Sequence, residues 1–167
     1  SYAAAAVGVS AKVVMHRAAN PARIEKAQRY GAEVILADDI PAAFETVRRI
    51  QDTEGRHLVH PFEGRRTVEG QATCGLELAR QIPKLDAVVI AVGGGGLIAG
   101  AGAAIKAVQP GCRVIGVEPA GAPGLTRSLE RGAPLERVDP DTIADSMGAP
   151  MHTQGTFEIA REVVDRM

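Results

Sequence analysis

The feature that most limits how this chain can fold is a run of four glycines, Gly93–Gly96. Asp86–Val92, just before it, is apolar and rich in β-branched residues, which is typical of a parallel strand covered on both faces. Leu97–Val108, just after it, predicts a helix that packs closely on a sheet. Residues without Cβ atoms let another group approach the backbone, and amides at a helix N-terminus have no intrahelical partner. The pattern therefore predicts an anion site, usually for phosphate.

The other segments alternate between strand-like and helix-like patterns, with short connections between them. The expected strands are Ala11–Met15, Glu33–Ala37, Arg56–Phe62 and a segment ending at Glu118; the expected helices start at Pro21 after an Asn20 cap, at Asp38 or Asp39, at Thr67, at Leu97, at Leu125 and at a Thr156 cap. Regular β-α alternation predicts a doubly wound arrangement with parallel strands.

Length and composition exclude several classes of protein. A chain of 167 residues with 46% hydrophobic residues suits one globular domain or pieces of two. A net charge of −1 and 3% aromatic residues give no nucleic-acid-binding pattern. No apolar run reaches membrane-spanning length, and no signal peptide is visible at Ser1. Cys74 and Cys112 are isolated and are expected to be free core thiols, which favours a cytoplasmic protein. From the charge, the aromatic content and the lack of a long apolar run, we expect no nucleic-acid or membrane partner.

The glycine run alone does not show which phosphate compound binds there. Gly94-x-Gly96-x-x-Ala99 is a permitted dinucleotide fingerprint, and Glu118 follows roughly 20 residues on, where a ribose-binding acid belongs. That pattern favours a domain of an NAD-type oxidoreductase. The alternative is a smaller cofactor, pyridoxal phosphate. A cofactor-free binding or regulatory module on the same fold is a third possibility.

Further motifs in a fixed order carry a family resemblance. They are Gly31-Ala32-Glu33-Val34, His60-Pro61-Phe62, Gly70-Gln71-Ala72-Thr73, Gly93–Leu97 as GGGGL, Gly116-Val117-Glu118-Pro119 and Thr142-Ile143-Ala144-Asp145. Together they span nearly the whole chain. The chain thus resembles the fold-type II pyridoxal-phosphate enzymes, in the branch of the threonine/serine dehydratases and serine racemases.

The resemblance implies both a fold and an activity. The implied fold is α/β with doubly wound parallel sheets in a three-layer αβα arrangement, similar to tryptophan synthase β and incomplete here. Residues 1–62 would form part of a small domain, and residues 63–167 part of a large cofactor-binding domain. The implied activity is that of a pyridoxal-phosphate-dependent threonine/serine dehydratase, an ammonia-lyase that gives a 2-oxo acid and ammonia. Serine racemase is the alternative within the family, and a homo-oligomer acting on a small amino acid is expected.

The resemblance also assigns residues. The backbone amides of Gly93, Gly94, Gly95, Gly96 and Leu97 would hold the phosphate of pyridoxal 5'-phosphate, and Ser146 stands near the cofactor where the family usually has glycine. The family's Schiff-base lysine lies in a segment like S-x-K-x-R-G, which holds none of the four lysines of this chain. We therefore expect no catalytic residue here, and an interior fragment that is inactive alone.

A cation site is a further implication of the resemblance. Some members of the branch bind a divalent or monovalent cation near a glutamate, a backbone carbonyl and an aspartate. Glu118 and the carbonyl of Ala122 match by position, but Gly124 stands at the aspartate position. Hard cations bind several oxygen ligands, and the alternative role for Glu118 is that of a polar cap at a strand edge. None of the four histidines is predicted to be a general base, and His60 is expected to structure the domain junction.

Overall fold

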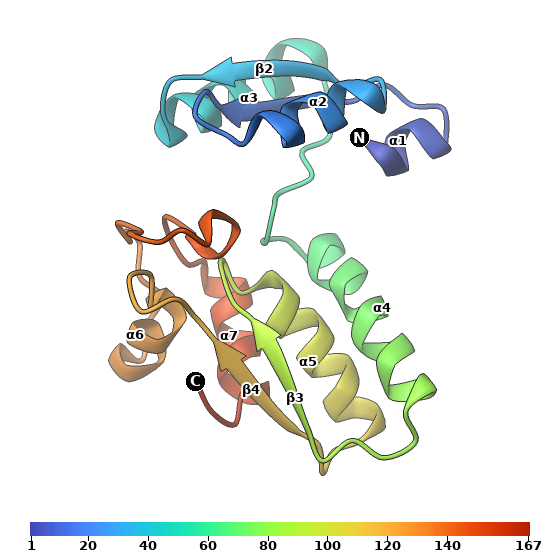
Figure 1. Cartoon of the computed structure of the whole chain (residues 1–167), viewed down its shortest axis with the longest axis vertical. Coiled ribbons are helices and arrows are strands. Elements are labelled where there is room, and N and C mark those ends of the chain that lie inside the picture. The colour runs from blue at the N-terminus through green and yellow to red at the C-terminus, as the bar shows by residue number, and fades with distance from the viewer. The chain divides into compact units, whose positions relative to one another are not determined.

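Two small parallel sheets organise the computed structural model, which describes residues 1–167 (Figure 1). The chain divides into two compact units, Ser1–Leu58 and Val59–Met167. The division falls just ahead of the boundary predicted after Phe62. No helix in the structure is long and apolar enough to cross a membrane.

The first unit is a parallel β-α-β unit with a helix at each end. Its elements are α1 (Tyr2–Ala6), β1 (Lys12–His16), α2 (Pro21–Arg29), β2 (Glu33–Ala37) and α3 (Ile40–Glu54). β1 pairs with β2 so that Val14 lies opposite Ile35.

Local rules account for the helix ends of the first unit. The side chain of Asn20 accepts a hydrogen bond from the Ala22 amide at 2.9 Å, and that of Asp39 accepts one from the Ala42 amide at 2.7 Å. Each oxygen satisfies an amide that has no partner inside its helix. Gly55 ends α3 with a left-handed φ of 63°, which glycine adopts without a Cβ clash. The predicted caps of both helices are confirmed.

The second unit contains the glycine run. Its elements are α4 (Arg65–Gln81), β3 (Ala87–Ala91), α5 (Gly96–Val108), β4 (Arg113–Val117), α6 (Gly124–Arg131), a 3₁₀ turn (Asp145–Met147) and α7 (Gln154–Val163). β3 and β4 are parallel, with Val89 opposite Ile115. The core lies between this sheet, α5 and α7, where Ile98, Val114 and Phe157 are almost fully buried.

Helices α4 and α5 are in close contact at two glycines. A Cβ atom on Gly75 of α4 would run into the backbone of Ala101, and one on Gly100 of α5 would run into the carbonyl oxygen of Val68. Small residues at these positions let the two backbones approach each other directly. Gly75 and Gly100 thus bring the backbones of α4 and α5 into direct contact.

Three local predictions are wrong. Residues Arg56–Phe62 form no strand, because no strand of the chain lies beside this connection between the two units. Thr156 does not cap the last helix: Thr153 is the N-cap residue, and Thr156 lies in the first turn of α7. β3 is covered on one face only, since Val88 and Ile90 are buried whereas Val89 is 69% exposed. The first and third errors concern neighbours distant in sequence, which local patterns do not report, whereas the cap is displaced by only three residues.

After α7 the chain returns along β4. The Asp165 amide donates to the Val114 carbonyl at 2.9 Å, and the Gly116 amide donates to the Arg166 carbonyl at 2.8 Å. The Asp165 carboxylate accepts a hydrogen bond from the Val114 amide at 2.7 Å and pairs with Lys106 at 2.7 Å. Lys106 first, and then the Val114 amide, hold the pKa of the Asp165 carboxyl below its ordinary value.

This shift predicts an acid-dependent part of the stability. A carboxyl with a lowered folded-state pKa stabilises the fold above its unfolded pKa of about 3.9, and that contribution is lost as pH falls through the folded value. We expect Asp165→Asn, which keeps an oxygen for the Val114 amide, to lower the melting temperature at pH 7. The difference from the wild type should shrink below about pH 4. Thermal melts between pH 7 and pH 2.5 test this, and a difference independent of pH would contradict it.

Candidate functional site

The glycine run forms a tight turn between β3 and α5. Val92 donates the last hydrogen bond to the neighbouring strand, from its amide to the Val117 carbonyl at 2.9 Å. Gly95 is the N-cap residue of α5, with φ +88°, and no side chain caps this helix. The amides of Gly94, Gly95, Gly96 and Leu97 donate no hydrogen bond within the chain, although the three glycines are buried. Buried amides normally have an acceptor, so this turn fits an external anion.

Other parts of the second unit closely approach three of the glycines, and two of these positions, Gly94 and Gly96, have no room for a side chain. A Cβ atom on Gly94 or on Gly96 would collide with Phe62, on the ring for Gly94 and on the backbone for Gly96. A Cβ atom on Gly93 would lie 3.2 Å from the Ser146 carbonyl oxygen. Side chains and backbone of the same chain thus fill the space next to the glycine Cα atoms, which is the close approach expected from the sequence. The backbone amides of the turn have no hydrogen-bond partner in the chain. The structure brings Ser146 to the turn through its backbone.

His60 holds the residue that covers the glycines. Its Nδ1 accepts hydrogen bonds from the Glu63 amide at 3.0 Å and from the Phe62 amide at 3.3 Å. The His60 and Phe62 rings meet edge to face, with centroids 4.7 Å apart. Burial lowers the pKa of His60, which favours the neutral ring that can accept these bonds. His60 therefore structures the turn that places Phe62 on the glycine run.

Two side chains that sequence patterns do not assign to the site lie beside Gly95. They are His152, in the loop before α7, and Thr156, in the first turn of α7. Thr156 donates from Oγ1 to the Gly94 carbonyl at 3.3 Å, which ties the turn to α7. His152 is 5% exposed, and burial lowers its pKa although Glu118 acts in the opposite direction. Sequence patterns mark Thr156 only as a helix cap and do not mark His152 at all, and neither is linked to the turn because both lie more than fifty positions from it.

Glu118 caps a helix. Its carboxylate accepts hydrogen bonds from the Leu125 amide at 2.6 Å, the Thr126 amide at 2.9 Å and Thr126 Oγ1 at 2.7 Å, all at the start of α6. The Ala122 carbonyl accepts one from the Gly124 amide at 2.9 Å. No three His, Cys, Asp or Glu side chains gather so that they could hold a metal ion. The cation predicted at Glu118 and Ala122 stays a prediction, and these carboxylate oxygens already have partners.

Two of the four lysines form ion pairs within their own units. Lys12 pairs with Glu54 at 2.7 Å and with Glu33 at 3.3 Å inside the first unit. Lys106 lies in the last turn of α5, at the end opposite the glycines, and pairs with Asp165. Both amines are therefore paired with carboxylates of their own unit.

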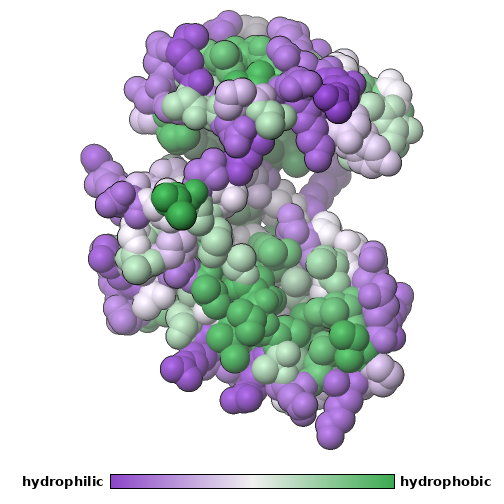
Figure 2. All heavy atoms as spheres, in the orientation of Figure 1, coloured by the Kyte–Doolittle hydropathy of each residue, from purple (hydrophilic) through white to green (hydrophobic).

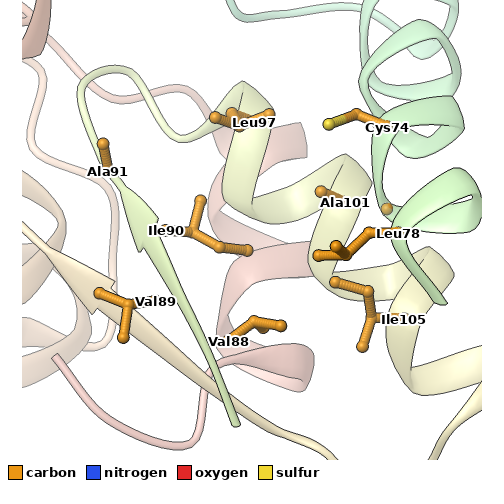
Figure 3. A pocket seen from close by; sticks show the side chains of 10 residues that line it. Cys74, Leu78, Val88, Val89, Ile90, Ala91, Leu97, Ala101 and Ile105 are labelled. Atoms are coloured by element: carbon orange, nitrogen blue, oxygen red, sulfur yellow. The ribbon is translucent and has the colours of Figure 1, made fainter. Parts of the chain in front are cut away.

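An apolar groove of about 220 Å³ lies along β3 and reaches Leu97 at the start of α5 (Figure 3). Leu78 of α4, Ala101 and Ile105 of α5, and Val88 and Ile90 of β3 line it. Hydrophobic groups gather on this face of the second unit (Figure 2). Cys74 borders the groove and is exposed, so only Cys112 of the two free cysteines is a core thiol as predicted. The groove offers no hydrogen-bonding side chain that could orient a phosphate compound.

Comparison with known proteins identifies the family. Residues 1–167 match the family model described as "Pyridoxal-phosphate dependent enzyme". The chain is 50% identical to phenylserine dehydratase of Ralstonia pickettii over 167 residues, which is 100% of this chain and 51% of that protein. It is 41% identical to L-threonine ammonia-lyase of Thermotoga maritima, over 99% of this chain and 41% of that protein. The chain thus spans about half the length of the curated relatives it matches, or somewhat less.

A solved structure agrees with the fold and with the family. Maize serine racemase superposes with a TM-score of 0.93 at 33% identity, over 99% of this chain and 50% of that one. This likeness confirms the predicted α/β fold of the fold-type II enzymes. A family match over the whole chain decides against the dinucleotide alternative, which accounted only for Gly94 to Glu118. The chain belongs to the pyridoxal-phosphate dependent enzyme family, in the branch that contains the threonine/serine dehydratases and serine racemases.

Proposed function

We propose that the polypeptide carrying this chain is a pyridoxal-phosphate-dependent dehydratase that converts a hydroxy amino acid into a 2-oxo acid and ammonia. The observation that carries the proposal is the set of amides at Gly94–Leu97, three of them on buried glycines, that have no acceptor in the chain. The names of the relatives with 50% and 41% identity, phenylserine dehydratase and L-threonine ammonia-lyase, support this reaction type.

In this proposal the chain supplies the phosphate anchor. Amides of Gly93–Leu97 donate to the phosphate oxygens, and the N-terminal end of the α5 dipole favours their negative charge. Phe62 and Thr156 hold the turn in shape from two sides. When bound, pyridoxal phosphate supplies an electron sink for the carbanion formed at the substrate's α-carbon. A rigid anchor orients the cofactor ring, so a loosened turn is expected to reduce both binding and rate.

Other assignments belong to the same proposal. Ser146, whose backbone lies against Gly93, borders the substrate pocket and affects the choice of amino acid. No lysine lies in a motif like S-x-K-x-R-G, so the 167 residues alone are expected to be inactive. We also propose a homo-oligomer acting on a small-molecule substrate, and a cytoplasmic location, which the two free cysteines support. Residues 1–62 and 63–167 are proposed as parts of the small and the large domain.

An assay with three substrates tests the reaction. The natural polypeptide containing these residues is incubated with pyridoxal phosphate and L-threonine, L-serine or phenylserine, and 2-oxo acid and ammonia are measured together. Equimolar release of the two products is expected. Conversion of L-serine to D-serine without ammonia would instead favour a racemase, which the likeness to maize serine racemase makes the second candidate. Absence of both products with a bound cofactor would overturn the proposal.

A further inference from the structure

The buried hydroxyl of Thr156 lies against the peptide that joins Gly94 to Gly95. Its Oγ1 donates to the Gly94 carbonyl at 3.3 Å, and a Cβ atom on Gly95 would stand 3.6 Å from both Oγ1 and Cβ of Thr156. Thr156 is 1% exposed and lies in the first turn of α7. Gly94 is buried as well, and a buried carbonyl needs a hydrogen-bond donor. A side chain 62 positions away supplies that donor.

A second hydroxyl leaves the proton of Thr156 available for this bond. Thr153 Oγ1 and Thr156 Oγ1 are 2.9 Å apart, and one of them donates to the other. The Thr153 carbonyl is 3.3 Å from Thr156 Oγ1, but it already accepts from the Phe157 amide at 3.0 Å. A proton given to Thr153 would leave the Gly94 carbonyl without this donor. The assignment that pairs all these groups has Thr153 donating to Thr156 and Thr156 donating to Gly94, and bonds in such a chain strengthen one another.

The direction of the Gly94 carbonyl fixes the direction of the next amide. The chain contains no cis peptide bond, and across a planar trans peptide the C=O and the N–H point in opposite directions. Because the Gly94 carbonyl is directed at Thr156 of α7, the Gly95 amide is directed away from it. That amide is one of the donors at Gly94–Leu97 without an acceptor in the chain. Thr156 thus lies behind the turn, on the side opposite to the one where the Gly95 amide would bind an anion.

Glycine on both sides leaves this peptide free to turn over. Reversing a peptide plane changes ψ of the residue before it and φ of the residue after it, which here are Gly94 and Gly95. The φ of Gly95 is +88°, and glycine adopts negative φ about as readily as positive φ. The bare residues that expose the amides therefore leave the orientation of this peptide undetermined by local sterics. A donor fixed in the core of the unit selects one of the two orientations.

We propose that Thr156 is a positioning residue for the phosphate-binding turn: by holding the Gly94 carbonyl, its hydroxyl directs the Gly95 amide toward the phosphate. The inference rests on the proposed function, because the phosphate is that of pyridoxal phosphate. Thr156 acts through the Gly94–Gly95 peptide and not by contact with the cofactor. Its loss should weaken the binding of the phosphate and leave the binding of the pyridine ring unchanged.

Three substitutions separate the hydroxyl from the packing of the side chain. Thr156→Val keeps the size and branching but removes the donor, Thr156→Ser keeps the donor but removes a methyl group, and Thr156→Cys provides a thiol that donates weakly. We expect the dissociation constant of pyridoxal 5'-phosphate to rise about tenfold in Thr156→Val and to stay within about threefold of wild type in Thr156→Ser. Thr156→Cys should lie between them, and it takes the place of the valine variant if that variant does not fold. Calorimetry on the natural polypeptide measures binding, and thermal melts verify folding.

Two further readouts locate the loss at the phosphate. Pyridoxal, which lacks the phosphate, should bind equally well to the wild type and to Thr156→Val. The ³¹P resonance of bound pyridoxal phosphate should move in Thr156→Val and keep its wild-type position in Thr156→Ser, because the phosphate loses the Gly95 donor only in the first variant. Thr53→Val is the matched control, since Thr53 lies on α3 and donates within its own helix, to the Arg49 carbonyl at 2.8 Å. It should leave every readout unchanged.

The outcomes distinguish this inference from the proposed function. If Gly95→Val loses pyridoxal phosphate while Thr156→Val binds it like the wild type, the inference fails and the proposed function stands. Equal losses in Thr156→Val and Thr156→Ser would show that packing, and not the hydroxyl, matters. Equal losses of pyridoxal phosphate and pyridoxal would show that the effect does not lie at the phosphate, and either result overturns the inference. A wild type that binds no pyridoxal phosphate would overturn both.

Discussion

Replacing Gly100 by leucine is expected to prevent stable folding of the second unit. The first atom of any side chain at this position would run into the Val68 carbonyl and come within 2.8 Å of the Ala72 amide nitrogen, both on the backbone of α4. Backbone atoms move only if the whole helix moves, so α4 and α5 would have to separate. Overpacking of this kind costs about 3 kcal/mol or more, a large share of the stability of an ordinary domain.

Gly70→Ala is the matched control for this experiment. Gly70 lies on α4, is exposed, and has no atom within 4 Å of the position of a Cβ. Alanine there should stabilise the unit by about 0.5–1 kcal/mol because it reduces the freedom of the unfolded chain. Urea unfolding followed by circular dichroism measures both changes. A Gly100→Leu variant with the unfolding free energy of the wild type would show that α4 and α5 are not packed backbone to backbone.

Substituting Gly95 by valine is expected to abolish retention of pyridoxal phosphate. The φ of Gly95 is +88°, a region that residues with a Cβ rarely adopt, although a Cβ here would meet only ordinary contacts at 3.6 Å from Thr156. The cost of valine is therefore conformational. Relaxation of φ to negative values would turn the neighbouring amides away from their common target, and we expect the cofactor to bind at least a hundredfold more weakly, since several charge-assisted hydrogen bonds are lost.

Gly132→Val provides a control with the same kind of backbone strain. Gly132 ends α6 with φ +76° and has open space around it. Both variants should lose comparable stability, of about 1–2 kcal/mol, but only Gly95→Val should lose the cofactor. Absorbance of bound pyridoxal phosphate after gel filtration of the natural polypeptide measures retention. Full occupancy in Gly95→Val would refute the assignment of the phosphate to this turn.

Local chemistry explains which parts of the fold could be predicted. The caps at Asn20 and Asp39 and the left-handed glycine after α3 are interactions between near neighbours, and the sequence contains both partners within a few residues. The strand predicted at Arg56–Phe62 failed for the opposite reason. A strand exists only beside a partner, and the apolar residues of that segment do not show whether one is present.

The glycine turn illustrates the same limit within the candidate site. Its place between a strand and a helix follows from the pattern around Gly93–Gly96, and so does the expectation of an anion. The pattern did not reveal that Phe62 covers Gly94 and Gly96, nor that Glu118 caps α6. Those contacts depend on where side chains point after the elements have packed.

Apart from the strand predicted at Arg56–Phe62, the sequence by itself determined the order of strands and helices and the position of the glycine turn, because these follow from residues close together along the chain. It also indicated the family, through ordered motifs spread over nearly the whole chain. Only the tertiary structure decided which groups surround that turn. Phe62, His152 and Thr156 come from segments about thirty to sixty positions away, where no periodic pattern links them to the glycines. Their positions result from packing of α5 against α4 and α7, which is a property of the whole unit.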